Sequence, residues 1–112
     1  MKKRVLSGMR PTGPLHLGHL AGALDNWVSM QSKYDCFFMI ADWHALMSEY
    51  ENPAKIQDYI FECAVDWMSC GIDHKKSTIF VQSKVREHLE LAMILADITP
   101  LAWLERNPTY KE

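Results

Sequence analysis

The sequence lacks several features that mark whole classes of protein. None of its apolar runs approaches the roughly 18–20 residues that a membrane-spanning helix needs. Its three cysteines form no Cys-x-x-Cys pair, and their odd number favours reduced, buried thiols over a disulfide framework. Five glycines and five prolines among 112 residues are too few for a collagen-like or low-complexity chain. These absences leave a small globular domain, or a piece of a larger one.

Charge of one sign is also scarce, because the formal net charge at pH 7 is only −2. A mildly acidic chain does not carry a nucleic-acid footprint over its whole surface, so any RNA contact must be local. The basic start at residues 1–4 is similar to the start of a signal peptide, but Gly8 and Pro11 interrupt the apolar stretch that would have to follow. We therefore expect a cytoplasmic protein without a membrane partner.

What the sequence does contain is an alternation of short apolar runs and segments of helical period. The runs predict strands at residues 5–9, 36–41 and 78–81, the second of them buried on both faces. Recurrence every three or four residues predicts helices from 17 to about 31, from Asn52-Pro53 to Gly71, and from Ser83 to Thr99. In the second helix Asn52 is the expected N-cap and Pro53 the first helical residue.

The resulting order is β-α-β-α-β-α, which indicates a parallel sheet with right-handed crossovers. The predicted fold class is therefore α/β, a Rossmann-like nucleotide-binding fold of which three strands make only the first half. We expect residues 1–112 to be one portion of such a domain, with no second domain. A three-stranded parallel sheet leaves an apolar strand unpaired at an edge, which isolated domains avoid.

The loop after the first predicted strand is the segment most suited to binding a ligand. Ligands of such sheets bind at the carboxyl ends of the strands, and residues 10–19 run from one of these ends into a helix start that favours anions. Gly13 and Gly18 have the Walker spacing, but no Lys-Ser or Lys-Thr pair follows, and no Gly-x-Gly-x-x-Gly occurs. We expect His16 and His19 to donate to phosphate oxygens, with a base or ribose close to the bare Cα of Gly18.

Four segments in this order resemble the tryptophanyl-tRNA synthetases, a family of class I aminoacyl-tRNA synthetases. Residues 11–19, Pro-Thr-Gly-Pro-Leu-His-Leu-Gly-His, are similar to the family's "HIGH" signature. Residues 41–45 (Ala-Asp-Trp-His-Ala), 79–83 (Ile-Phe-Val-Gln-Ser) and 103–112 (Trp-Leu-Glu-Arg-Asn-Pro-Thr-Tyr-Lys-Glu) extend the resemblance over nearly the whole chain. In members of this family, the Lys-Met-Ser-Lys-Ser-type loop, the anticodon-binding domain and the acidic residue that recognises the indole N–H lie later in the sequence than these four segments. The chain is therefore expected to be an N-terminal portion of such an enzyme.

The resemblance implies an activity and a set of site residues. Family members join tryptophan to ATP as tryptophanyl-adenylate, with Mg²⁺ on the ATP and no protein-bound metal, and then charge tRNA(Trp) as homodimers. By motif position, ATP would be held by Arg10, Pro11, Thr12, His16, Gly18 and His19, with His16 and His19 as the catalytic pair. The tryptophan pocket would be formed by Leu6, Gly8, His44 and Gln82. Attack by the substrate carboxylate needs no protein nucleophile, so positioning and electrostatics must supply the rate.

Other interpretations remain open at this stage. The chain could belong to a tyrosyl-type synthetase or another nucleotidyltransferase with the same histidine signature, or it could bind ATP or tryptophan without catalysis. A zinc site of His16, His19 and His44 fits by ligand type, but no cysteine or carboxylate has matching spacing. His44 alone is compatible with a structural histidine bonded to backbone, whereas His74 and His88 have no motif around them and are predicted to lie on the surface.

Overall fold

The computed structural model describes residues 2–111 and contains a three-stranded parallel sheet in the order β1-β2-β3. The strands are β1 (Arg4–Met9), β2 (Asp35–Ile40) and β3 (Ser77–Val81), close to the predicted ranges. Their register pairs Met9 with Ile40 and Ile40 with Val81. The carboxyl ends of all three strands therefore meet at one edge of the sheet, which is where the predicted site must form.

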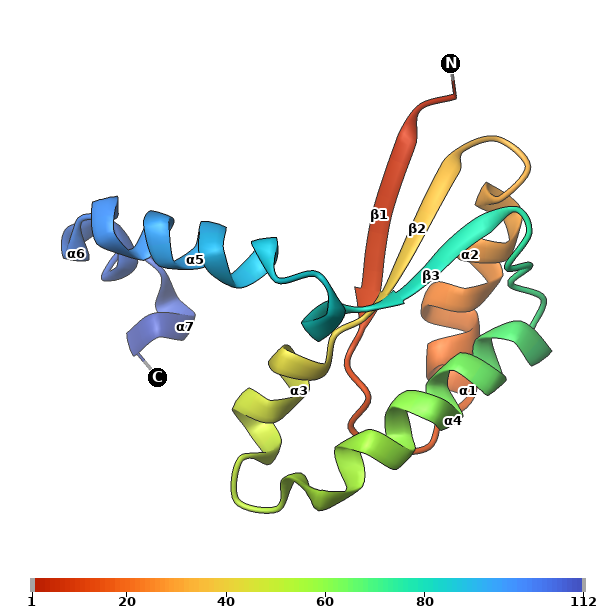
Figure 1. The fold of residues 1–112 in the computed structure, drawn as a ribbon, viewed down its shortest axis with the longest axis horizontal. Coiled ribbons are helices and arrows are strands. Elements are labelled where there is room, and N and C mark those ends of the chain that lie inside the picture. Colours follow the sequence, from red (N-terminus) through yellow and green to blue (C-terminus); the bar gives the residue numbers. More distant parts are fainter. Residues whose placement is uncertain (1, 112) are drawn as a thin grey trace.

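Two helical segments cover one face of the sheet (Figure 1). The first is a continuous run of α1 (Leu17–His19), the π-helical turn η1 (Leu20–Leu24) and α2 (Asp25–Met30). The second is a 3₁₀ turn, η2 (Pro53–Lys55), that leads into α4 (Ile56–Ser69). Gly71 follows α4 with φ 109°, a left-handed conformation that glycine adopts without strain, which confirms the predicted end of this helix.

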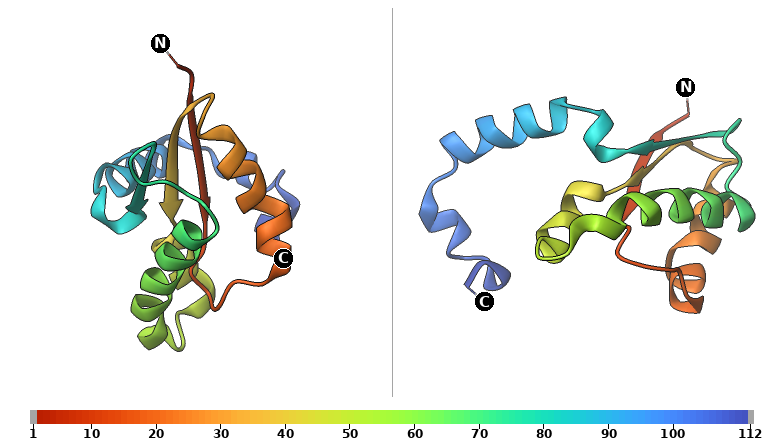
Figure 2. Two further views of the ribbon diagram at one scale, coloured as in Figure 1. Left: turned by 90° about the vertical axis from the view of Figure 1, so that its right-hand side faces the viewer. Right: turned by 60° about the horizontal axis from the view of Figure 1, so that its bottom comes forward.

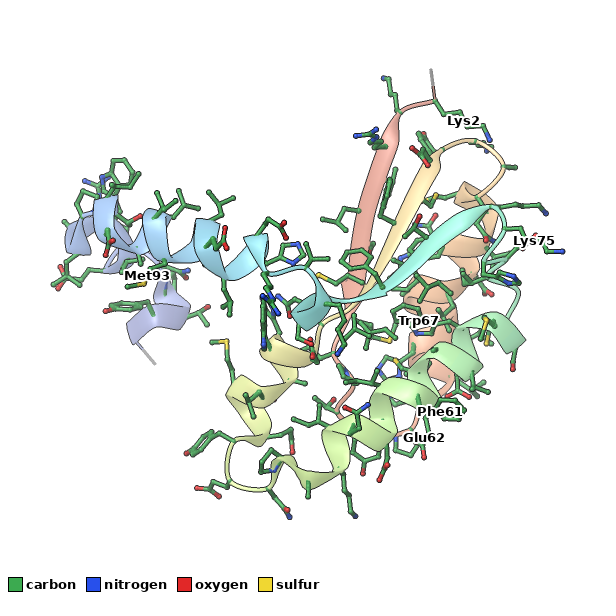
Figure 3. All side chains as sticks on the ribbon, in the orientation of Figure 1. Lys2, Phe61, Glu62, Trp67, Lys75 and Met93 are labelled. Atoms are coloured by element: carbon green, nitrogen blue, oxygen red, sulfur yellow. The ribbon has the colours of Figure 1, made fainter. Side chains whose placement is uncertain are left out.

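Aromatic side chains join these helices to the central strand. Trp27 of α2 stacks on Phe38 of β2 with ring centroids 4.7 Å apart, and meets Trp67 of α4 edge to face at 5.0 Å. Trp67 is fully buried, whereas Phe61 and Glu62 on the same helix are exposed (Figure 3). Fully burying one such ring removes a large apolar area from water, a gain of about 1.5–3 kcal/mol for each large side chain.

The prediction that the second strand is buried on both faces is wrong. Cys36, Phe38 and Ile40 are buried beneath α2 and α4, but Phe37 and Met39, which point to the other face, are only half-buried. Both neighbours of β2 are edge strands, and the buried core lies on the face under α2 and α4. One face of β2 therefore carries the core, and its opposite face is only half-buried.

The helices differ from the prediction in three respects. A helix that the sequence analysis missed, α3 (Asp42–Glu49), follows β2 directly. Asn52 makes no side-chain capping bond, although Pro53 does open the helical segment. The helix predicted from Ser83 starts at Glu87, because residues 82–84 form the 3₁₀ turn η3 (Gln82–Lys84) and Val85 is extended.

The last quarter of the chain extends away from the sheet as an arm of three helices (Figures 1 and 2). These are α5 (Glu87–Ile98), which stops before Pro100 as predicted, α6 (Leu101–Leu104) and α7 (Pro108–Lys111). None of the side chains described in residues 87–110 is fully buried, and the apolar residues Met93, Ile98, Leu101 and Trp103 are each more than half exposed. Among the residues described, no helix is both long and apolar enough to cross a membrane.

Candidate functional site

The loop that leaves β1 is anchored before it reaches the helix. Pro11 is fully buried, so its ring fixes the course of the loop rather than lining an open surface. The Thr12 N–H donates to the Arg10 carbonyl oxygen at 3.0 Å, which closes a tight turn. Arg10 and Thr12 remain exposed on either side of the buried proline. Their side chains are therefore accessible at the edge where the strands end.

The two histidines of the "HIGH"-like segment form a reciprocal cap at the start of α1. The Gly18 N–H donates to Nδ1 of His16 at 3.1 Å, and the His16 N–H donates to Nδ1 of His19 at 3.2 Å. The ring centroids lie 4.0 Å apart. We call this arrangement of His16, Gly18 and His19 the histidine turn. It satisfies two backbone donors that a helix start otherwise leaves without partners.

This geometry fixes the tautomer of both rings. A nitrogen that accepts a hydrogen bond carries no proton, so each neutral ring bears its proton on Nε2. The Nε2–H groups of His16 and His19 point away from the bonds that hold the rings, since Nδ1 and Nε2 lie on opposite sides of an imidazole. The turn therefore presents two oriented donors, the arrangement expected of a site that receives phosphate oxygens.

Gly18 lies directly against the ring of His16. A Cβ on this residue would lie 2.8 Å from Cε1 and 3.0 Å from Nδ1 of His16. The imidazole of His16 thus lies in the space beside the bare Cα. The missing side chain matters because it lets the His16 ring lie against the backbone that it caps.

Acidification is expected to weaken the fold through His19. Partial burial, and secondarily the adjacent His16, lower the pKa of His19 below its usual 6.5. A lowered folded-state pKa means that the unfolded chain binds this proton more readily, so the contribution is fully present above pH 6.5 and is lost as pH falls through the lowered value. NMR titration of His19 should give a midpoint below 6.5, and the free energy of unfolding should fall less on acidification in His19→Asn. A midpoint above 6.5 would contradict this.

Three of the residues predicted to bind the substrate tryptophan lie together on the face of the sheet that α2 and α4 leave open. Leu6 of β1, His44 of α3 and Gln82 of η3 line one cavity of about 350 Å³, which we call the strand-end cavity. The rest of its wall is formed by Met39, Trp43, His88, Leu89 and Ala92. Apolar walls with a few polar groups are typical of a pocket for a small ligand. Trp43 and His88 were not assigned to the site by sequence, because neither direction nor distance along α3 and α5 is readable from the pattern.

His44 and Gln82 are bonded to each other across this cavity. Nδ1 of His44 lies 3.0 Å from Oε1 and 2.9 Å from Nε2 of Gln82, so the ring either donates to the amide oxygen or accepts from the amide nitrogen. Gln82 is a buried polar residue, and His44 remains exposed. The alternative of a structural histidine bonded to backbone does not describe His44, since its partner is a side chain from another strand end.

A second hollow of about 300 Å³ adjoins the first. Its wall includes Arg10, Gly8 and His44, so His44 is shared between the two. Gly8 is required here by close packing, since a Cβ at this position would lie 2.7 Å from the Met39 carbonyl oxygen. The predicted residues Leu6, Gly8, Arg10, His44 and Gln82 are therefore brought together. The histidine turn is not among them, because His16 lines a different hollow between α1 and α4.

The remaining titratable groups do not assemble into a metal centre. Within residues 2–111, no three His, Cys, Asp or Glu side chains lie close enough together to hold a metal ion. Burial, and secondarily Asp66, raise the pKa of the Cys63 thiol to about 11, so this cysteine stays protonated at neutral pH. Cys70 is exposed rather than buried, because α4 has ended before it.

Known proteins resemble this chain over its whole length. The family model of "tRNA synthetases class I (W and Y)" matches residues 1–112. A tryptophan–tRNA ligase of Ralstonia nicotianae is 56% identical over 110 residues, which cover 98% of this chain and 28% of that ligase. The corresponding ligase of Thermotoga maritima is 53% identical, with 97% of this chain and 34% of that ligase covered. The chain thus spans about a third of the length of these relatives.

Solved structures agree with this assignment. A crystal structure of tryptophanyl-tRNA synthetase from Campylobacter jejuni superposes with a TM-score of 0.88 at 39% identity, covering 99% of this chain and 34% of that one. A second crystal structure of that enzyme, complexed with ADP and tryptophan, has a TM-score of 0.87 at 40% identity and covers 96% and 34%. The predicted Rossmann-like class I fold is confirmed. This chain belongs to the class I tRNA synthetases of the tryptophan and tyrosine type.

Proposed function

We propose that residues 1–112 form the N-terminal portion of the catalytic domain of a tryptophan–tRNA ligase. The longer enzyme activates tryptophan with ATP to tryptophanyl-adenylate, releases pyrophosphate and transfers the tryptophanyl group to tRNA(Trp). The observation that carries this proposal is the convergence of Leu6, Gly8, His44 and Gln82 on adjoining hollows at the strand ends. Identities of 56% and 53% to proteins named as tryptophan–tRNA ligases favour tryptophan over tyrosine.

The amino acid occupies the strand-end cavity in this proposal. Its volume of about 350 Å³ and its apolar lining suit an aromatic side chain. Leu6, Met39 and Trp43 supply apolar surface, and the bonded pair of His44 and Gln82 supplies polar contacts that orient the ligand. The hollow shared by Arg10 and His44 then receives the reacting carboxylate and the α-phosphate, since it adjoins both the cavity and the loop.

ATP binds along the loop from Arg10 to His19, with Mg²⁺ carried on its phosphates. Arg10 supplies a positive charge, Thr12 an exposed hydroxyl, and buried Pro11 holds the loop that presents them. The Nε2–H groups of the histidine turn donate to phosphate oxygens as negative charge develops, with Gly18 giving His16 its room. The substrate carboxylate attacks the α-phosphorus, so these residues act by positioning and by charge stabilisation.

Partners beyond the two small substrates follow from the same proposal. The apolar arm of α5, α6 and α7 is the surface for a second copy of the chain, since Met93, Ile98, Leu101 and Trp103 are too exposed to remain in water. tRNA(Trp) is bound by the longer enzyme. A cytoplasmic location is consistent with a role in protein synthesis.

Tryptophan-dependent exchange between ATP and pyrophosphate tests the proposed function directly. The longer enzyme that contains this chain is expected to exchange label with tryptophan and not with tyrosine. Exchange with tyrosine instead would assign the chain to the sister specificity. Binding of an ATP analogue without any exchange would identify a nucleotide-binding module that has no ligase activity.

A further inference from the structure

His88 does not lie on a featureless surface, although the sequence predicted that it would. It stands in the first turn of α5, and its ring stacks on Phe80 of β3 with centroids 6.2 Å apart and planes 19° apart. The ring is half-buried and forms part of the wall of the strand-end cavity. His88, which belongs to no recognised sequence motif, is thus held at the cavity where the amino acid is proposed to bind.

The same ring contacts the backbone of η3. Nδ1 of His88 lies 3.4 Å from the carbonyl oxygen of Gln82, which also accepts from the Val85 N–H at 3.1 Å. A carbonyl oxygen only accepts, so Nδ1 must carry the proton in this bond. The stack on Phe80 and the bond to Gln82 together leave the imidazole little freedom to turn.

The turn that His88 contacts is also held from the opposite side. The Ser83 N–H donates to Oδ1 of Asp42 at 3.0 Å, which ties η3 to the start of α3. The Gln82 side chain is bonded to His44 on that same helix. Gln82 therefore lies between α3 and α5, with its side-chain amide bonded to His44 and its backbone carbonyl oxygen bonded to His88. Loss of the α5 contact leaves the turn held from one side.

We propose that His88 is a positioning residue for the amino-acid substrate. By holding the backbone carbonyl of Gln82, His88 keeps the side-chain amide of Gln82 against His44. The ring of His88 also forms part of the cavity wall. This inference rests on the proposed function of the strand-end cavity and adds a residue to it. It separates the role of His88 from ATP binding, because no contact of His88 reaches Arg10 or the histidine turn among the described bonds.

Steady-state exchange kinetics of the longer enzyme test the inference. His88→Ala is expected to raise the KM for tryptophan about tenfold, as expected when an oriented hydrogen bond is lost, with the KM for ATP changed less than about twofold. His88→Asn places an amide donor where Nδ1 stood and should restore most of the loss. His88→Phe keeps a ring to stack on Phe80 but has no donor, so its tryptophan KM should stay raised. His74→Ala, an exposed histidine in the turn before β3, is the matched control.

Four outcomes would overturn it. An unchanged tryptophan KM in His88→Ala excludes a positioning role while leaving the ligase function intact. Equal increases in both KM values, together with a lower melting temperature, indicate a structural role alone. If His88→Ala does not fold, the asparagine and phenylalanine variants decide, and equal tryptophan KM values in these two contradict the inference. A wild-type enzyme that shows no tryptophan-dependent exchange refutes the proposed function, and the inference falls with it.

Discussion

Replacement of Gly18 by alanine is expected to reduce kcat/KM for ATP in pyrophosphate exchange by about 10²-fold, the loss typical of one misplaced donor in a charge-stabilising site. The added Cβ would lie 2.8 Å from Cε1 of His16, closer than real side chains approach. The backbone of α1 is fixed by its own hydrogen bonds, so the ring must move. His16 then loses its bond to the Gly18 N–H, and its Nε2–H no longer points where ATP is proposed to lie.

Gly22→Ala provides the matched control for this substitution. Gly22 lies one turn further along the same helical segment, and a Cβ built there meets nothing within 4 Å. Alanine in a helix is favoured over glycine by about 0.5–1 kcal/mol, so Gly22→Ala should be neutral or slightly stabilising and should leave exchange unchanged. Unimpaired exchange in Gly18→Ala would contradict the proposed role of the histidine turn. Equal impairment in both variants would point to the helix rather than to His16.

The sequence was sufficient to predict the elements that depend on local pattern. The three strands and the main helices follow from runs and periods of apolar residues, which hold wherever the burying partner lies. The failures have a common cause in tertiary contacts. α3 was missed because Ala45 is its only buried residue, which gives no periodic apolar face to detect. The π-helical turn η1 was missed because its apolar spacing is the same as that of an α-helix.

The candidate site shows the same division. His16 and His19 were singled out because their motif is contiguous in sequence, whereas Leu6, His44 and Gln82 were assigned only through the resemblance to a known family, and their roles stay predictions. His88 was missed because its place at the cavity depends on how α5 leaves η3, which no local pattern encodes. The expected approach of a base or ribose to Gly18 stays a prediction, and the sequence pattern did not indicate that the His16 ring lies beside this glycine.

Gln31→Leu is expected to lower the free energy of unfolding of the chain by about 2–4 kcal/mol, a large share of the roughly 5–15 kcal/mol typical of a domain. Gln31 is a buried polar residue at the end of α2. Its Oε1 accepts from the Asp73 N–H at 2.7 Å and from the Ser77 hydroxyl at 3.1 Å, and its Nε2 donates to the Gly71 carbonyl oxygen at 3.0 Å. One amide thus ties α2 to the connection between α4 and β3.

Leucine has a similar volume but makes none of these bonds, so the donors and the acceptor lose their partner inside the protein. A buried polar group left without a hydrogen-bond partner costs more than the net gain of the bond it once made, which is why the expected loss is large.

Urea unfolding monitored by tryptophan fluorescence measures the effect, with Gln57→Leu on the exposed face of α4 as the control that makes the same substitution. The loss should be smaller when Ser77→Ala is added, because that substitution removes the buried hydroxyl left without a partner. A change below about 0.5 kcal/mol in Gln31→Leu, the size typical of a surface substitution, would contradict this and show that the apolar contacts of Trp27, Val28 and Met30 hold α2 without the amide.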